Sequence, residues 1–182
     1  MVSTRMRGRA WVFKGILDVD WEICPFDIQR ELRQKGIPIT DEELGKYCMT
    51  TLDPDFPKKV GKGDFIVGAE NVGYGHDHFH ACRSIRGAGV AAVLCESSNA
   101  IFFRNSVECG LPVVECKGVK EAASQGDELE VDLAVGTIRN LTTGRPLHFT
   151  PYPSFLLEMV EAGGVYALLQ KKGLTRVGTG RG

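Results

Sequence analysis

The chain has 182 residues, of which 43% are hydrophobic and 25% are charged, and its formal net charge at pH 7 is −1. This length and composition predict one domain with a single well-formed core. The near balance of basic and acidic residues excludes a general electrostatic attraction to nucleic acid or to a membrane surface. No run of residues is apolar for long enough to predict a transmembrane helix.

The cysteines indicate the compartment. The sequence contains six of them but no C-x-x-C pair, and its first residues lack the apolar segment of a secretory signal. These features argue against a zinc ribbon and against a secreted disulfide framework. We therefore expect a cytoplasmic protein with reduced thiols.

The first third of the chain is expected to contain a strand, an acidic turn and two short helices, at residues 11–13, 18–25, 26–36 and 40–48. Thr40 and Glu43 form a capping-box pattern, in which the threonine side chain accepts a hydrogen bond from the N–H of Glu43. Residues 53–57, Asp-Pro-Asp-Phe-Pro, predict a loop.

The middle of the chain alternates apolar strands with helical patterns. Strands are predicted at residues 65–67, 90–94 and 111–114. One helix follows the first strand with Ala81 and Ile85 on its apolar side, and the next is capped by Ser97, Ser98 or Asn99. This alternation predicts an α/β unit with parallel strands.

The second half changes to an antiparallel pattern. Short strands at residues 128–133, 137–139 and 147–149 predict a meander. Pro153 opens a helix that Gly163-Gly164 ends, and a last helix ends near Lys172. We expect a single domain over residues 1–174 and a mobile tail over residues 175–182.

The most informative segment is residues 68–80, Gly-Ala-Glu-Asn-Val-Gly-Tyr-Gly-His-Asp-His-Phe-His. A glycine-rich loop here leads from a strand into a helix and carries three alternating histidines and an aspartate. Such a junction directs unpaired backbone N–H groups and the positive end of the helix dipole at the loop. The segment therefore predicts a binding site for a carboxylate or a phosphate.

Several other segments match a known family in the right order: G-R-A-W-V-F at 8–13, D-V-D at 18–20, I-C-P at 23–25, L-D-P-D-F at 52–56, G-D-F-I-V at 63–67, G-L-P-V-V at 110–114, V-D-L at 131–133, I-R-N-L-T-T-G at 138–144 and F-L-L-E-M-V-E-A-G-G at 155–164. From residue 9 to about residue 172, the chain resembles the small subunit of 3-isopropylmalate dehydratase, which corresponds to the swivel domain of aconitase.

The resemblance implies an α/β fold of the aconitase swivel type, a compact β/β/α domain with a mixed parallel and antiparallel sheet and flanking helices. It also implies a partner, the large subunit of an aconitase-family dehydratase, which carries a [4Fe-4S] cluster. The small subunit closes over that cluster like a lid. No cofactor is expected to be bound by this chain.

The glycine loop is where the chain departs from the family, whose usual motif is G-x-N-F-G-x-G-S-S-R-E-H-A. In that motif a serine is the base and the arginine binds a substrate carboxylate. Five positions are retained: Asn71, Gly73, Gly75, His80 and Ala81. His76 and Asp77 replace the two serines, His78 replaces the arginine, and Phe79 replaces the glutamate.

These replacements suggest roles for the loop residues. His76 lies at the position of the family's base, and an imidazole near a helix N-terminus favours the neutral form that accepts a proton. We therefore predict that His76 is the general base. Asp77 is expected either to cap the next helix or to orient a histidine. A protonated His78 could bind a substrate carboxylate, and His80 is expected to be structural.

Further substrate contacts are expected from the glycine loop and from the helix that follows it, at Asn71, Gly73, Tyr74, Gly75 and Arg83. Arg83 would restore the positive charge that is lost with the family's arginine. Residues 26–40, whose sequence matches the family least, are expected to carry the substrate-specific contacts.

The alternation of His76, His78 and His80 is also typical of a metal site. Alternate residues share one face of a strand, but on a helix they lie about 200° apart, which argues against three-histidine coordination. His76 and His78 could still share an ion with Asp77 within the loop.

The resulting hypothesis is the small subunit of a two-component iron–sulfur hydro-lyase acting on a small hydroxylated di- or tricarboxylic acid. The partner's cluster would act as a Lewis acid on the departing hydroxyl, while His76, oriented by Asp77, removes the proton from the neighbouring carbon. Two alternatives remain: a small subunit of the 2,3-dimethylmalate dehydratase type, and a non-catalytic swivel domain that binds a metal or ligand. Neither nucleic acid nor a membrane is an expected partner.

Overall fold

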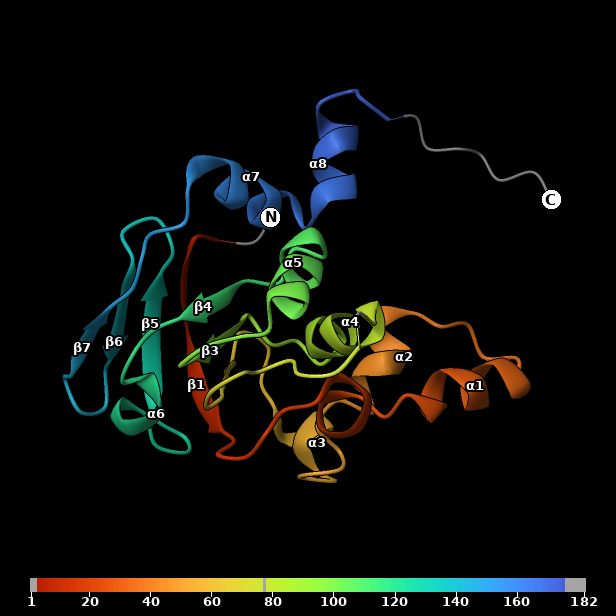
Figure 1. Cartoon of the computed structure of the whole chain (residues 1–182). Helices are drawn as coiled ribbons and strands as arrows, with labels where there is room; N and C mark the ends of the chain where they lie inside the picture. The colour runs from red at the N-terminus through yellow and green to blue at the C-terminus, as the bar shows by residue number, and fades with distance from the viewer. Residues whose placement is uncertain (1–2, 77, 176–182) are drawn as a thin grey trace.

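The computed structural model describes residues 3–76 and 78–175, so the tail predicted at residues 175–182 lies outside the described part except for its first residue. The described part contains one seven-stranded sheet with the strand order β4-β3-β2-β1-β5-β6-β7 (Figure 1). The strands are β1 (Arg5–Val12), β2 (Phe65–Val67), β3 (Ala92–Cys95), β4 (Val113–Glu115), β5 (Glu128–Asp132), β6 (Thr137–Asn140) and β7 (Pro146–His148).

Strands β1 to β4 form the parallel half of the sheet, as the alternation of strands and helices predicted. Helix α4 (Phe79–Gly87) connects β2 to β3, and helix α5 (Ala100–Glu108) connects β3 to β4. Of the three candidate caps for α5, Asn99 accepts the hydrogen bond from the N–H of Ile101, at 2.9 Å. Strands β2 and β3 are apolar and buried throughout, which is typical of a parallel sheet whose two faces are both covered.

Strand β1 belongs to both halves of the sheet. Its residues 10–12 pair in parallel with β2, whereas residues 5–9 pair antiparallel with β5. The prediction of a strand at residues 11–13 missed this first part, because arginines interrupt its apolar residues. Arg5 and Arg7 are largely exposed and donate hydrogen bonds to two glutamates of β5. Strands β5, β6 and β7 then form the predicted antiparallel meander.

The other helices are short: the π-helix η1 (Val19–Ile23), α1 (Asp27–Gln34), α2 (Asp41–Gly45), α3 (Phe56–Lys59), α6 (Val119–Ala122), α7 (Ser154–Ala162) and α8 (Val165–Lys171). Thr40 caps α2 by accepting a hydrogen bond from the N–H of Glu43 at 3.2 Å, as predicted. Two predictions need correction: the expected acidic turn contains η1, and the loop expected at residues 53–57 runs into α3. No helix among the described residues is long and apolar enough to cross a membrane.

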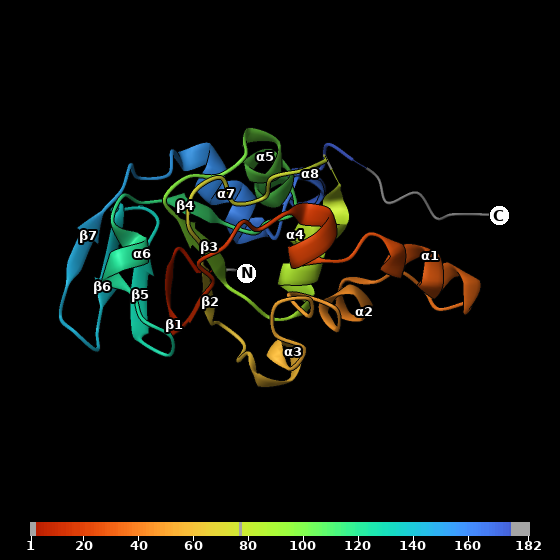
Figure 2. The ribbon, with the colours of Figure 1, turned by 60° about the horizontal axis from the view of Figure 1, so that its bottom comes forward.

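Alternate residues of the central strands enter two different cores. Ile66 and Val93 pack with Ala81 and other α4 residues in one core, whereas their neighbours along the strands pack with β5 and β6 in the other. A third, smaller cluster comprises Cys24, Leu32 and Leu44. Both ribbon views place β7 and α1 at opposite ends of the molecule (Figures 1 and 2). The segment from η1 to α3 therefore lies beside the parallel half of the sheet.

Candidate active site

The glycine loop lies against the segment that follows β1. Because β1 and β2 are parallel neighbours, with Val12 opposite Val67, the chain leaves both strands at the same edge of the sheet. The two segments are joined by backbone hydrogen bonds: the N–H of Gly73 donates to the carbonyl of Leu17, and the N–H of Val19 donates to the carbonyl of Tyr74, each at 2.8 Å. The sheet topology thus brings residues 17–20 to the histidines.

Two glycines of the loop allow this close approach. Gly73 has φ +80°, and a Cβ there would overlap the ring of Phe102. Gly75 has φ +113°, and its Cβ would lie only 3.0 Å from a carboxylate oxygen of Asp18. Both positions need a conformation that residues with a side chain rarely adopt, and both lack the space for one.

Asp20 is the centre of the site. Its Oδ2 atom lies 2.8 Å from Nδ1 of His76, and its Oδ1 atom lies 2.7 Å from Nδ1 of His78. Asp20 belongs to η1 and is buried, with 8% of its surface exposed. Its own N–H donates to Oδ1 of Asp18 at 2.7 Å, which fixes the start of η1. One carboxylate therefore holds both imidazoles.

The charge of Asp20 determines the tautomers of its partners. Burial alone would raise the pKa of Asp20, but the hydrogen bonds from His78 and His76 outweigh it, so the pKa lies below its ordinary value. An ionised carboxylate only accepts hydrogen bonds, so each Nδ1 carries a proton. In the neutral form of each imidazole, the lone pair that can accept a proton is then on Nε2. The His76 side chain is 79% exposed, so this atom is accessible from solvent.

An aromatic stack completes the site. The rings of His76 and His78 stack with their centroids 5.4 Å apart. The ring of Phe26 also stacks on His78, with the centroids 4.8 Å apart. Phe26 is half exposed and precedes α1. It is also the first residue of the segment 26–40, in which substrate-specific contacts were predicted. The structure thus places one end of that segment beside the histidines.

His80 differs from the other two histidines because it is buried, with 3% of its surface exposed. Its Nε2–H donates to the carbonyl of Cys24 at 2.8 Å, and Nδ1 has no partner among the described residues. Burial is the main reason that the pKa of His80 lies below its ordinary value. A neutral, buried imidazole that ties α4 to η1 agrees with the structural role predicted for it.

The other predicted site residues are either paired with neighbouring segments or exposed to solvent. Arg83 donates to Oδ1 of Asp41 at 2.6 Å and to the carbonyl of Ile39 at 2.9 Å, so its charge is already paired with α2. Asn71 is exposed, and its N–H donates to Ser97. Tyr74 is also exposed. The predicted role of Asp77 lies outside the described residues, while the N-cap position of α4 is occupied by His78.

Asp20 is the candidate site residue that sequence reasoning missed. It lies in the D-V-D turn, which carried the family resemblance, but it is 56 residues from His76 and 58 from His78. The available signal was the parallel pairing expected for the strands, which brings the segments after β1 and β2 together.

The same residues could also hold a metal ion. One ligand atom each from Asp20, His76 and His78 lies within 4.8 Å of the others, and this is the group of three potential ligands found among the described residues. Two imidazoles and a carboxylate suit zinc and similar divalent ions. The group contains no cysteine, so within the described part the thiols do not form a site for an iron–sulfur cluster.

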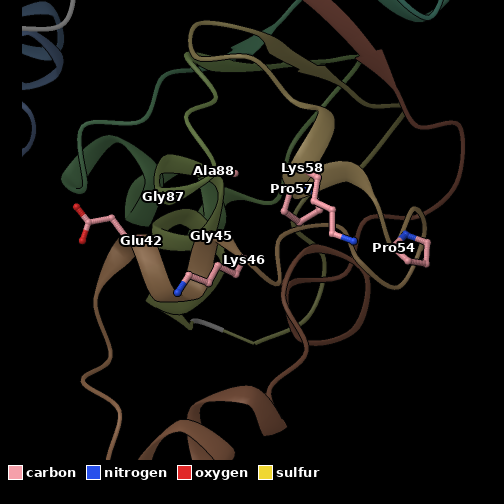
Figure 3. Close-up of a pocket in the computed structure, with 8 residues that line it drawn as sticks. All are labelled: Glu42, Gly45, Lys46, Pro54, Pro57, Lys58, Gly87 and Ala88. Atoms are coloured by element: carbon pink, nitrogen blue, oxygen red, sulfur yellow. The ribbon is translucent and has the colours of Figure 1, made fainter.

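A separate pocket lies between α2, α3 and the end of α4 (Figure 3). Its lining comprises Glu42, Gly45, Lys46, Pro54, Pro57, Lys58, Gly87 and Ala88. At Gly45 and Gly87, α2 and α4 approach each other so closely that a Cβ on either glycine would overlap the backbone of the other helix. The pocket contains none of the three histidines, so it is not part of the candidate active site.

Comparison with known proteins identifies the family. No protein-family profile matches the chain. The isopropylmalate/citramalate isomerase small subunit of Methanocaldococcus jannaschii is 46% identical over 92% of this chain and 95% of its own length. A 3-isopropylmalate dehydratase small subunit of Thermotoga maritima is 43% identical over 92% of this chain and 96% of its own. The chain belongs to the family of 3-isopropylmalate dehydratase small subunits.

A solved structure supports the same assignment. The crystal structure of 3-isopropylmalate dehydratase from Methanocaldococcus jannaschii superposes with a TM-score of 0.82 and 30% sequence identity, covering 93% of this chain and 96% of that one. Membership of the 3-isopropylmalate dehydratase small-subunit family confirms the predicted resemblance and the predicted α/β fold with a mixed sheet. It also confirms the prediction of a hydro-lyase small subunit.

Proposed function

We propose that this chain works with a large subunit that carries a [4Fe-4S] cluster, and that the pair dehydrates a small 2-hydroxydicarboxylic acid. The observation that supports this proposal is the hydrogen bonding of His76 and His78 to one buried carboxylate, at the loop position of the family's base. Substrates to test include 3-isopropylmalate, citramalate and 2,3-dimethylmalate. The first two occur in the name of a relative.

In this proposal His76 is the general base. With Nδ1–H bound to Asp20, its Nε2 atom accepts the proton from the carbon next to the one that bears the hydroxyl. The Asp20 carboxylate then stabilises the imidazolium and keeps the ring in one orientation. A serine in the same position would need an additional base to become reactive, whereas an imidazole is basic near neutral pH.

His78 has a different role, which is to bind a substrate carboxylate in its protonated form. Its Nδ1–H is bound to Asp20 and Phe26 covers one face of the ring, so a proton on Nε2 would be the one offered to the substrate. An imidazolium offers a single N–H where the family's arginine offers a fork of donors. We therefore expect a different substrate preference from that of relatives with the arginine.

When bound in the large subunit, the cluster supplies the Lewis acid for the departing hydroxyl. The described residues of this chain do not fit the cluster, because their group of potential metal ligands contains no thiol. The contribution of this chain is then to position the substrate and to accept the proton.

The test is a reconstituted pair of subunits assayed on the substrate panel. His76→Gln should lower kcat by roughly 10²-fold or more, the usual contribution of a positioned general base. The matched control is His148→Gln, because His148 is exposed on β7, away from the loop. Full proton–deuterium exchange at the substrate carbon in His76→Gln would remove His76 from the mechanism.

The group of Asp20, His76 and His78 favours a second candidate function, the binding of a divalent metal ion by this chain alone. Zinc or nickel at one ion per isolated chain, lost in His78→Gln and kept in His148→Gln, would support this alternative. Purified chain without stoichiometric metal that is nevertheless active with its large subunit would exclude it as the main function.

A further inference from the structure

Two cysteine thiols are in contact where α4 packs against α5. Sγ of Cys82, in α4, donates a hydrogen bond to Sγ of Cys109, and the two atoms are 3.3 Å apart. Cys109 directly follows α5, so the contact joins α4 to the C-terminal end of α5. Cys82 also donates to the carbonyl of Phe79, at 3.0 Å.

The surroundings favour a thiolate at Cys109. The hydrogen bond from Cys82 is the largest effect and lowers the pKa of Cys109; burial opposes it, and the positive charge of Arg86 assists it. Asp41 opposes this effect and Arg83 adds to it, with the result that the pKa lies below its ordinary value. The same hydrogen bond and burial raise the pKa of Cys82. Cys109 is therefore the more acidic thiol of the pair and the better candidate for the attacking thiolate.

Cys109 is also the more accessible thiol. It is partly exposed, whereas the other five cysteines are buried. It lines a surface pocket together with Arg83, Arg86, Tyr166 and residues at the end of α7. The pocket also contains the carboxylates of Asp41 and Glu108, and Asp41 is paired with Arg83. Glutathione disulfide carries both carboxylate and ammonium groups, which match this mixture of charges.

We propose that Cys82 and Cys109 are a redox-active pair that glutathione disulfide converts reversibly into an intramolecular disulfide. The thiolate of Cys109 attacks one sulfur of glutathione disulfide, which breaks that disulfide and releases one glutathione thiolate. Cys82 gives up its proton to the released glutathione thiolate and attacks the Cys109 sulfur of the mixed disulfide, which expels the second glutathione as a thiolate. Two protein thiols are oxidised, and one glutathione disulfide is reduced to two glutathiones.

The geometry requires only a small movement. A disulfide brings the two sulfur atoms to about 2.05 Å, so the present separation of 3.3 Å must shorten by roughly 1.3 Å. Rotation of the two side chains, with a small shift at the C-terminal end of α5, can provide it. The product would tie the helix that follows the glycine loop to α5.

The experiment uses the reduced full-length chain and glutathione buffers of increasing oxidised fraction. After an acid quench and alkylation with N-ethylmaleimide, the intact mass of the oxidised chain should show two N-ethylmaleimide adducts fewer than that of the reduced chain. Peptide mapping should join Cys82 to Cys109. The Cys82→Ser variant should instead stop at a mixed disulfide that carries one glutathione on Cys109, and Cys109→Ser should form neither product.

Matched controls are Cys95→Ser and Cys116→Ser, which should form the Cys82–Cys109 disulfide as the unchanged chain does. Circular dichroism of each variant checks that the fold is kept. The proposal is overturned if oxidation joins other cysteines, or if the folded chain keeps six free thiols under the most oxidising buffer. It is also overturned if Cys82→Ser takes up no glutathione while remaining folded.

Discussion

Asp20→Asn in the reconstituted enzyme gives the sharpest test of the site. The substitution keeps the shape of a buried side chain but removes its charge and one of its two acceptors. The amide oxygen can accept a hydrogen bond from only one of the two imidazoles, and the amide nitrogen opposes the Nδ1–H of the other. If the nitrogen faces His76, that ring must move its proton to Nε2 and loses the lone pair that accepts the substrate proton.

The size of the effect follows from the two hydrogen bonds of 2.7 and 2.8 Å. A hydrogen bond to a charged group contributes about 1.5–3 kcal/mol, and 1.36 kcal/mol corresponds to a factor of ten in rate. The loss of one such bond to the imidazolium in the transition state predicts a decrease in kcat of about 10- to 150-fold. The decrease should apply to each substrate that the enzyme accepts.

The assay is proton–deuterium exchange at the substrate carbon together with steady-state dehydration. Asp55→Asn is the matched control, because Asp55 is exposed just before α3 and pairs with Lys58 and Lys59. That variant should leave kcat unchanged. A folded Asp20→Asn enzyme with the kcat of the unchanged chain would refute the assignment of Asp20 as the residue that orients the base.

Three further predictions concern stability, measured by urea unfolding. Gly73→Ala should destabilise the fold by roughly 2–4 kcal/mol, because φ is positive there and the new Cβ would overlap Phe102. Gly144→Ala, where φ is similar but the space is open, should cost only about 1 kcal/mol. Equal costs would show that the overlap with Phe102 does not destabilise the fold. Because burial lowers the pKa of His80 in the folded state, the unfolded chain binds its proton more readily. The free energy of unfolding should therefore fall as the pH drops below about 6.5, with a slope of up to about 1.4 kcal/mol per pH unit. His80→Gln should remove this slope, and an unchanged slope in the variant would contradict the prediction. Asn140→Ala should cost about 3 kcal/mol or more, since this buried amide donates two hydrogen bonds and accepts two; a cost below about 1 kcal/mol would show that water replaces them.

The parallel half of the sheet could be predicted from the sequence because its signals are local. Buried strands such as β2 and β3 are continuous apolar runs, and the spacing of Thr40 and Glu43 predicts the cap of α2. The start of β1 and the π-helix η1 could not be predicted in this way. The first is a mostly charged strand stabilised by pairing with β5, and the second depends on contacts with the glycine loop.

In the candidate site, too, local patterns were predicted from the sequence and long-range contacts were not. His76 and His78 were predicted because they follow a glycine loop at a strand–helix junction, where local pattern and family position agree. The partner carboxylate of Asp20 was not predicted, because its contact with them depends on the pairing of β1 with β2 and not on neighbouring residues. The proposed orienting role of Asp77 stays a prediction.

The separation of the candidate site from the two large cores has an evolutionary consequence. The proposed reacting groups lie on η1 and on the glycine loop, whereas the two large cores are built mostly from the sheet and from the helices that pack on it. A few substitutions at the tip of the loop can therefore exchange one set of proton-transfer groups for another while leaving most of the buried packing unchanged. A lineage could in this way acquire a new substrate by local mutation and keep the same scaffold and the same docking partner.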